Sequence, residues 1–219
     1  MVRSTKGRGA EGSGGTRKLA VRVRTAKGRK IASTRWLQRQ LNDPYVDEAK
    51  RRGYRSRAAF KLAEIDDKYR LLKPGMIVVD LGAAPGGWSQ IAAQRVQLMA
   101  GKGRVIALDL AEFEPVSGVT HLTLDMTEPE TAELIRAALD GMTADIVLSD
   151  MHAPATGHRP TDHLRIMGLA EAALDLAESI LAPGGVFLAK VRHVKPKASR
   201  ADSAEMYVLA TGFRGASAD

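Results

Sequence analysis

The sequence lacks cysteine, has few aromatic residues and contains no long apolar run. The absence of cysteine excludes a disulfide framework. No stretch of 18 or more apolar residues is present and no charged-then-apolar start marks a secretory signal, so neither a membrane span nor secretion is expected. The protein is therefore expected in the cytoplasm with no membrane partner. A monomer is the expected state. Its 219 residues, 44% of them hydrophobic, suffice for one sizeable core.

Positive charge is concentrated at the N-terminus. Residues 1–30 hold ten Lys/Arg against one acidic residue, a balance of +9, and residues 31–61 add +5. Residues 62–219 carry −6, so a mildly acidic body follows a strongly basic N-terminal quarter. This distribution favours an anionic partner, for which nucleic acid is the natural candidate and a solubilising role is the alternative.

The chain divides by composition into an arm and a folded domain. Residues 1–30 are Gly-, Ser- and base-rich with little to bury, which predicts a largely disordered basic arm. Residues 31–219 form the expected domain, which begins with a helical extension over 31–73 that faces RNA. Within it, helical spacing predicts one helix over 33–53, broken or restarted at Pro44, and a second over 56–72.

Short β-branched runs then alternate with helical patterns. This alternation predicts an α/β fold with a mostly parallel sheet covered on both faces. The expected strands are 77–82, 104–110, 120–126, 145–151, 186–191 and 206–213, and the expected helices are 87–99, 129–140 and 162–182.

A glycine-rich turn, VVDLGAAPGGWSQ (78–90), follows the first expected strand. Ligands bind at this end of parallel strands, and glycines let the backbone approach them closely. The spacing differs from the G-x-G-x-x-G dinucleotide fingerprint and includes a proline. Asp80 precedes the first glycine and would repel a pyrophosphate, which favours a cationic nucleoside ligand such as S-adenosylmethionine.

Four strands are each expected to finish with an aspartate at the same edge of the sheet. These residues are Asp80, Asp109, Asp125 and Asp150. Asp109 is placed to accept hydrogen bonds from a ribose diol, a group that NAD and S-adenosylmethionine share. Four carboxylates together would oppose the phosphates of NAD, although each one alone is as readily explained as a local turn or cap. An NAD-dependent oxidoreductase is therefore the disfavoured alternative.

Five segments of the chain, in order, closely resemble the bacterial FtsJ/RrmJ (RlmE) family. They are SRAAFKL (56–62), the glycine-rich turn (78–90), LSDM (148–151), APGGVFLAKV (182–191) and KPKASRADSAEMYVLATG (195–212). Members of that family are 2′-O-methyltransferases that modify a uridine in the A-loop of large-subunit (23S) ribosomal RNA. The resemblance implies a Rossmann-like fold with an antiparallel last strand, S-adenosylmethionine as cofactor, and a role in late large-subunit assembly.

The resemblance also implies particular site residues. The catalytic set falls on Lys61, Asp150, Lys190 and Glu205, and cofactor contacts fall on Gly86, Trp88, Asp109, Asp125 and Asp150. A ribose 2′-hydroxyl is a poor nucleophile, so the site must orient it and receive its proton. Our hypothesis is that Lys190 accepts the proton, Asp150 orients Lys190, and Lys61 and Glu205 place the ribose.

No metal is expected. The string MHAPATGHRPTDH holds three of the five histidines, but their spacing matches no ligand pattern, and a flexible loop that touches RNA is the preferred interpretation.

The C-terminal part of the chain is shorter than the family pattern. Lys190 and Glu205 are separated by fourteen residues, too few for the helix and parallel strand that the resemblance places there. One alternative is therefore a non-catalytic RNA-binding assembly factor that keeps the fold. Another is a 2′-O-methyltransferase of a different RNA, such as transfer RNA.

Overall fold

The computed structural model describes residues 37, 38, 41–152, 156–191 and 206–215. The chain divides into two compact units, residues 1–43 and 44–219, which are described separately. In the first, Leu37 and Gln38 are helical, and Asn42 Nδ2 donates a hydrogen bond to Gln38 O over 2.7 Å. The basic arm predicted for residues 1–30 lies outside the described residues.

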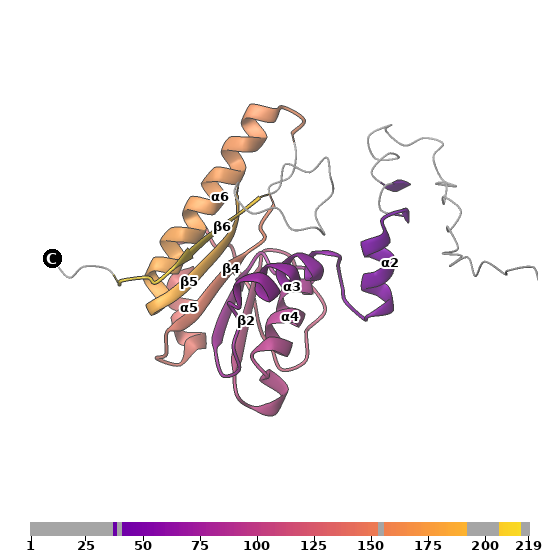
Figure 1. Ribbon diagram of the computed structural model, residues 1–219. Coiled ribbons are helices and arrows are strands. Elements are labelled where there is room, and N and C mark those ends of the chain that lie inside the picture. Colours follow the sequence, from indigo (N-terminus) through magenta and orange to yellow (C-terminus); the bar gives the residue numbers. More distant parts are fainter. Residues whose placement is uncertain (1–36, 39–40, 153–155, 192–205, 216–219) are drawn as a thin grey trace, which may run out of the picture. The chain divides into compact units, whose positions relative to one another are not determined.

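The second unit is built on a sheet whose described strands run in the order β3-β2-β1-β4-β5-β6 (Figure 1). The first five strands are parallel and β6 is antiparallel to β5, as predicted. The strands are β1 (Ile77–Leu81), β2 (Arg104–Asp109), β3 (Thr120–Thr123), β4 (Ala144–Ser149), β5 (Leu181–Val191) and β6 (Met206–Thr211). The helices are α2 (Pro44–Arg51), α3 (Ala58–Tyr69), α4 (Gly87–Arg95), the 3-10 turn η1 (Leu98–Ala100), α5 (Thr131–Leu139) and α6 (Arg159–Ile180).

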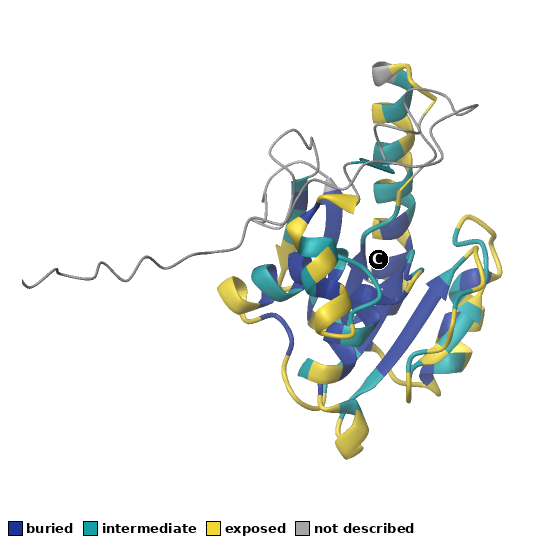
Figure 2. Ribbon diagram, turned by 90° about the vertical axis from the view of Figure 1, so that its right-hand side faces the viewer, coloured by how far each residue is buried: buried dark blue, intermediate teal, exposed yellow. Residues whose placement is uncertain are grey.

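Apolar residues cover both faces of the sheet. Successive side chains of a strand point to opposite faces of the sheet, so each buried strand contributes side chains to two core layers. One layer joins the sheet to α3 and α4 and contains Val78, Leu148 and Leu188. The other joins it to α5 and α6 and contains Val79 and Phe187. Figure 2 shows the strands as the buried centre of the unit.

The same alternation fixes which face the polar residues of the strands reach. Asp80 lies two residues after Val78, and Lys190 lies two residues after Leu188. Lys190 pairs directly with Tyr207 across the antiparallel β5–β6 ladder, so their side chains share a face. These three residues therefore point toward α3 and α4.

The predicted helices and strands are present where the structure describes them, with shifted ends; residues 33–36 and 39–40 of the first predicted helix lie outside the described residues. The restart at Pro44 is confirmed, because α2 begins there. Strand β3 ends at Thr123, so Asp125 follows it after one further residue. The segment 192–205, where the sequence predicted a shortened connection, lies outside the described residues. The direct pairing of β5 with β6 nevertheless confirms the expected antiparallel last strand.

Candidate active site

The glycine-rich turn between β1 and α4 depends on glycine at two close approaches. A Cβ at Gly82, whose φ is +72°, would collide with the Met151 side chain, and a Cβ at Gly87 would collide with Ser56 Oγ. Met151 follows β4, and Ser56 lies just before α3. The turn therefore brings β4 and α3 against the end of β1.

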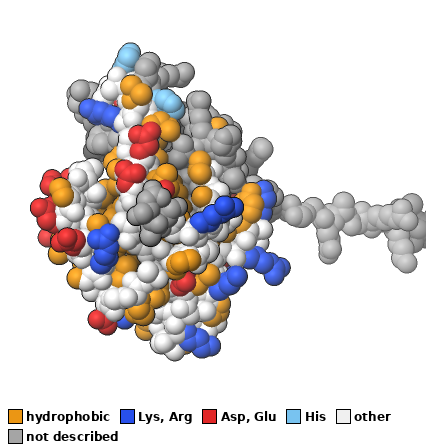
Figure 3. Space-filling view, turned by 90° about the vertical axis from the view of Figure 1, so that its left-hand side faces the viewer, with side chains coloured by type: hydrophobic (Ala, Val, Ile, Leu, Met, Phe, Trp, Pro, Cys, Tyr) orange, Lys and Arg blue, Asp and Glu red, His pale blue; other side chains and the backbone are white. Residues whose placement is uncertain are grey.

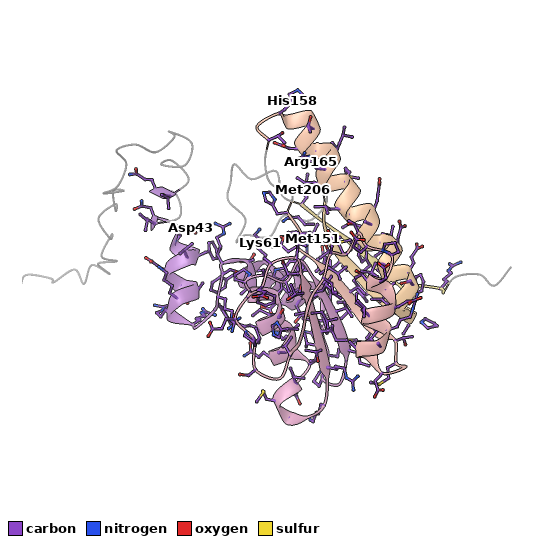
Figure 4. All side chains as sticks on the ribbon, turned by 180° about the vertical axis from the view of Figure 1, so that it is seen from behind. Asp43, Lys61, Met151, His158, Arg165 and Met206 are labelled. Carbon is purple, nitrogen blue, oxygen red and sulfur yellow. The ribbon has the colours of Figure 1, made fainter. Side chains whose placement is uncertain are left out.

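A cavity of about 760 Å³ opens beside this turn. Its size is within the range of small-molecule sites in proteins. It lies at the carboxyl ends of the strands and against α6, and its lining includes Gly82, Ala84, Asp109, Asp125, Asp150 and Arg165. Figure 4 labels Met151 and Arg165, which come from the end of β4 and from α6.

Asp109 is held at the end of β2 by two backbone donors. Its Oδ2 accepts a hydrogen bond from Ala84 N over 2.8 Å, and its Oδ1 accepts one from Ala111 N over 2.8 Å. A carboxylate has about four lone-pair sites, so each oxygen retains capacity for another donor. The residue is thus fixed in place and suited to the two hydroxyls of a ribose.

Asp125 lines the cavity from the connection after β3. Its Oδ1 accepts hydrogen bonds from Thr127 Oγ1 over 2.7 Å and from Thr127 N over 2.9 Å. These bonds stabilise the ionised carboxylate and hold the pKa of Asp125 below its usual value. Asp125 therefore presents a negative charge to the cavity.

The expectation that four aspartates lie together at one edge of the sheet is wrong for Asp80, which is buried. It is 1% exposed, within β1, and its Oδ2 accepts a hydrogen bond from Ser89 Oγ of α4 over 2.6 Å. Its Oδ1 has no hydrogen-bond partner in the described part of the chain. Burial raises the pKa of Asp80 to about 7 despite the Ser89 bond, and the charges of Asp150 and Asp109 add to the rise. Only the other three aspartates line the cavity.

Asp150 joins the cavity to a buried lysine. Lys190 is 8% exposed, and its Nζ lies 3.2 Å from Asp150 Oδ1 and donates to Asp150 O over 2.8 Å. The two residues are 40 positions apart and meet because β4 and β5 are neighbours. The structure therefore brings together two members of the predicted catalytic set.

Tyr207 completes this cluster, and the sequence analysis did not identify it. The side chain is fully buried in β6, and its hydroxyl donates to Asp150 Oδ1 over 2.8 Å. Lys61, which is 5% exposed on α3, has its Nζ 6.0 Å from the centroid of the Tyr207 ring. Lys61, Asp150 and Lys190 thus surround one tyrosine. Pairing AKV (189–191) antiparallel with MYV (206–208) in the sequence would have set Tyr207 opposite Lys190 and so identified the tyrosine.

Two residues that the resemblance assigned to the cofactor, Gly86 and Trp88, are not among the residues that line the cavity. Gly86 adopts a φ of +103° at the N-cap of α4. The Trp88 indole is 3% exposed and donates from Nε1 to Ala58 O over 2.9 Å, and its ring centroid lies 5.6 Å from that of Tyr207 at a tilt of 34°. Its side chain therefore serves to pack α4 on α3.

Arg55, a second residue that the sequence analysis missed, connects two loops. Its guanidinium donates to Pro85 O in the glycine-rich turn and to Glu114 O and Pro115 O in the loop after β2, the last over 2.7 Å. Its backbone N–H donates to Gln90 Oε1 over 2.9 Å. One side chain thus holds both loops that flank Asp109.

The family model for FtsJ-like methyltransferases matches residues 54–194, which include the turn, the cavity and Lys190. This chain belongs to the FtsJ-like methyltransferase family. The enzyme is 58% identical to the ribosomal RNA large subunit methyltransferase E of Parvibaculum lavamentivorans, over 95% of this chain and 92% of that protein. It is also 58% identical to the protein of that name from Rhodospirillum rubrum, over 93% of this chain and 85% of the relative.

A solved structure supports the same assignment. The ribosomal RNA methyltransferase from Plasmodium falciparum matches with a TM-score of 0.66 and 26% identity, and the match covers 74% of this chain and all of that one. The Parvibaculum match spans 236 residues, more than the 219 of this methyltransferase. That relative therefore contains residues with no counterpart here.

The cavity fits S-adenosylmethionine, the methyl donor of this methyltransferase. Asp109 has acceptor capacity for a ribose diol, and three carboxylates suit a ligand that carries a sulfonium and an ammonium group. In the described part of the chain no cluster of three or more His, Asp or Glu side chains could hold a metal ion. No described helix is long and apolar enough to cross a membrane. Glu205, the fourth predicted catalytic residue, lies outside the described residues.

Proposed function

We propose that this methyltransferase methylates the ribose 2′-hydroxyl of a uridine in large-subunit ribosomal RNA, late in subunit assembly. The observation that carries the proposal is the convergence of Lys61, Asp150 and Lys190 at the edge of a cavity that fits S-adenosylmethionine. The names of the relatives from Parvibaculum and Rhodospirillum support ribosomal RNA as the substrate.

In the proposed reaction, S-adenosylmethionine supplies an electrophilic methyl group on its sulfonium. As the ribose oxygen forms its bond to that methyl carbon, the carbon–sulfur bond breaks and the hydroxyl proton passes to Lys190 Nζ. Lys190 can accept a proton only in its neutral form. Lys190 is 8% exposed and its Nζ lies 3.2 Å from Asp150 Oδ1, so the amine is held at the edge of the cavity where the proton would be released.

The remaining predicted residues have supporting roles in this proposal. Asp109, Asp125 and Asp150 contact the cofactor from the cavity lining, while Gly86 and Trp88 shape and anchor the turn that borders it. Lys61 and Glu205 place the substrate ribose, and Asp150 orients Lys190.

Charge indicates how RNA reaches the site. The exposed face of α6 carries Glu171, Asp175 and Glu178, and Figure 3 shows acidic side chains along that face. We infer that RNA approaches from the other face of the sheet, over residues 44–73 of the basic extension, and that the arm 1–30 adds phosphate contacts.

The function is tested by transfer of a radiolabelled methyl group to large ribosomal subunits that lack the modification. Wild type and Lys190→Ala are compared, and the labelled nucleotide is mapped. We expect label on a uridine ribose with wild type alone. Absence of label with wild type, while the cofactor still binds in calorimetry, would contradict enzymatic function and favour an RNA-binding assembly factor. Label on transfer RNA in place of ribosomal RNA would contradict the substrate.

Deleting residues 1–30 tests the role of the arm. We expect weaker RNA binding and a flatter dependence of affinity on salt, because fewer phosphate counterions are released. Cofactor affinity should remain unchanged. An unaltered salt slope would show that the arm does not contact phosphates.

A further inference from the structure

The hydroxyl of Tyr207 and the ammonium of Lys190 meet the same carboxylate oxygen. Asp150 Oδ1 lies 2.8 Å from Tyr207 Oη and 3.2 Å from Lys190 Nζ. Both donors come from directly paired residues of β5 and β6, so the ladder sets the spacing between them. The arrangement is buried, because Tyr207 is 0% exposed and Lys190 is 8% exposed.

A shared acceptor oxygen has a chemical consequence for the lysine. A carboxylate favours the protonated form of a neighbouring amine, and a hydrogen bond from a neutral hydroxyl disperses part of the carboxylate charge. The Tyr207 hydroxyl therefore weakens the attraction between Asp150 and the proton of Lys190. Proton acceptance by Lys190 requires the neutral amine, so this weakening favours the reactive form.

The ring of Tyr207 acts on the other lysine. The ring centroid lies 6.0 Å from Lys61 Nζ, within the range of a cation–π interaction, and 5.6 Å from the centroid of the Trp88 ring. Packing between Trp88 and the β5–β6 ladder fixes the ring and therefore the direction of its hydroxyl. One rigid side chain thus contacts Lys61 with its ring and Asp150 with its oxygen.

We propose that Tyr207 is a positioning residue for methyl transfer, whose hydroxyl holds Asp150 and lowers the affinity of Lys190 for its proton. The proposal rests on the proposed function, in which Lys190 is the proton acceptor. The neighbouring elements also carry charged or titratable groups around this cluster: Lys61 from α3, Asp80 from β1, Asp109 from β2, His152 after β4 and Arg165 from α6. All of them are retained in the variant that tests the proposal.

The test is the pH dependence of single-turnover methyl transfer by Tyr207→Phe at saturating cofactor. This variant keeps the ring and its contacts with Trp88 and Lys61 but loses the hydroxyl. The rate of wild type is expected to rise with pH as Lys190 becomes neutral. In Tyr207→Phe this rise should move to higher pH by about one unit, which lowers the rate at neutral pH about tenfold, while the plateau at high pH is kept.

A matched control makes the same chemical change at the surface. Tyr69→Phe removes a hydroxyl from a side chain that is 38% exposed at the end of α3. Its profile should coincide with that of wild type. A Tyr207→Phe profile with an unmoved rise, whether or not its plateau is lower, would overturn the proposal, because a purely structural role lowers the rate equally at every pH.

A second measurement does not depend on activity. The 13Cε resonance of Lys190 in lysine-labelled protein, assigned by its loss in Lys190→Met, is followed against pH in wild type and in Tyr207→Phe. A midpoint that moves upward by about one unit in the variant supports the coupling, even if wild type transfers no methyl group and the proposed function fails. Equal midpoints would overturn the coupling even if wild type is fully active.

Discussion

The two halves of the ligand-binding edge of the sheet are built in different ways. On the side of β1, β2 and β3, the carboxylates of Asp109 and Asp125 accept hydrogen bonds from backbone N–H groups of the loops around them. On the side of β4, β5 and β6, side chains hold one another, as Asp150 does with Lys190 and Tyr207. The first half presents fixed acceptors to a ligand, whereas the second couples groups that can exchange a proton.

This difference separates binding from chemistry. The backbone N–H groups that hold Asp109 and Asp125 do not titrate, so this half has no donor that can give up a proton. The Asp150 cluster contains a lysine whose charge can change, and Asp150 itself lines the cavity. In the proposed mechanism, Asp150 is the residue at which the cofactor half meets the catalytic half.

The largest expected effect is that of Asp150→Ala. The substitution removes the charged partner of Lys190 and one wall of the cavity, so it should damage both halves. We expect the single-turnover rate to fall about 10³-fold or more and cofactor affinity to fall about tenfold. Asp175→Ala, an exposed aspartate on α6, is the matched control. Normal affinity in Asp150→Ala would place Asp150 in the catalytic half alone.

Asp80 offers the next largest effect, on stability. Its pKa of about 7 in the folded protein exceeds the ordinary value of 3.8, so the folded state holds a proton that the unfolded state releases. The free energy of unfolding should therefore fall as pH rises from about 4 through about 7, by up to about 4 kcal/mol in total, of which roughly 3 kcal/mol is lost above pH 5.

Asp80→Asn removes this titration and can still accept the Ser89 hydrogen bond. Urea unfolding at pH 5 and pH 8 should show a smaller loss of stability across this interval in the variant than in wild type. An identical loss in both proteins would mean that Asp80 is ionised throughout and that its charge is compensated within the fold.

A smaller effect is expected for Arg55→Lys, which alters only the cofactor half. Lysine keeps the charge but lacks the planar fork that reaches carbonyls of both loops. We expect the KM for S-adenosylmethionine to rise about fivefold while kcat is unchanged, since each lost hydrogen bond is worth about 1 kcal/mol. A lower kcat would show that these loops also position the catalytic half.

The comparison also explains what the sequence could predict. Asp109 and the glycine-rich turn lie at the ends of regular elements, so local patterns locate them. Tyr207 lies 57 residues from its partner Asp150 in the sequence, and Arg55 lies 60 residues from its partner Pro115. Only the strand order and the loop packing bring them to the site. Family resemblance located Lys61 and Lys190, which spacing alone would not have joined.

The misplacement of Asp80 has a simple physical origin. Its position before the first glycine suggested an edge residue like Asp109, but β1 continues through Leu81. Side chains alternate between the two faces of a strand, so the Asp80 side chain points toward α4. There its carboxylate accepts a hydrogen bond from the Ser89 hydroxyl. Asp109 is the last residue of β2 and faces the cavity, whereas Asp80 lies one residue before the end of β1 and is buried.

The division into a binding half and a catalytic half is tested most directly by single-turnover rates measured over a range of S-adenosylmethionine concentrations for Asp109→Ala and Lys190→Met. We predict that Asp109→Ala raises the half-saturating concentration 10- to 100-fold and keeps the plateau, while Lys190→Met lowers the plateau 10²- to 10⁴-fold and keeps the half-saturating concentration. A shift of both quantities in each variant would contradict the division.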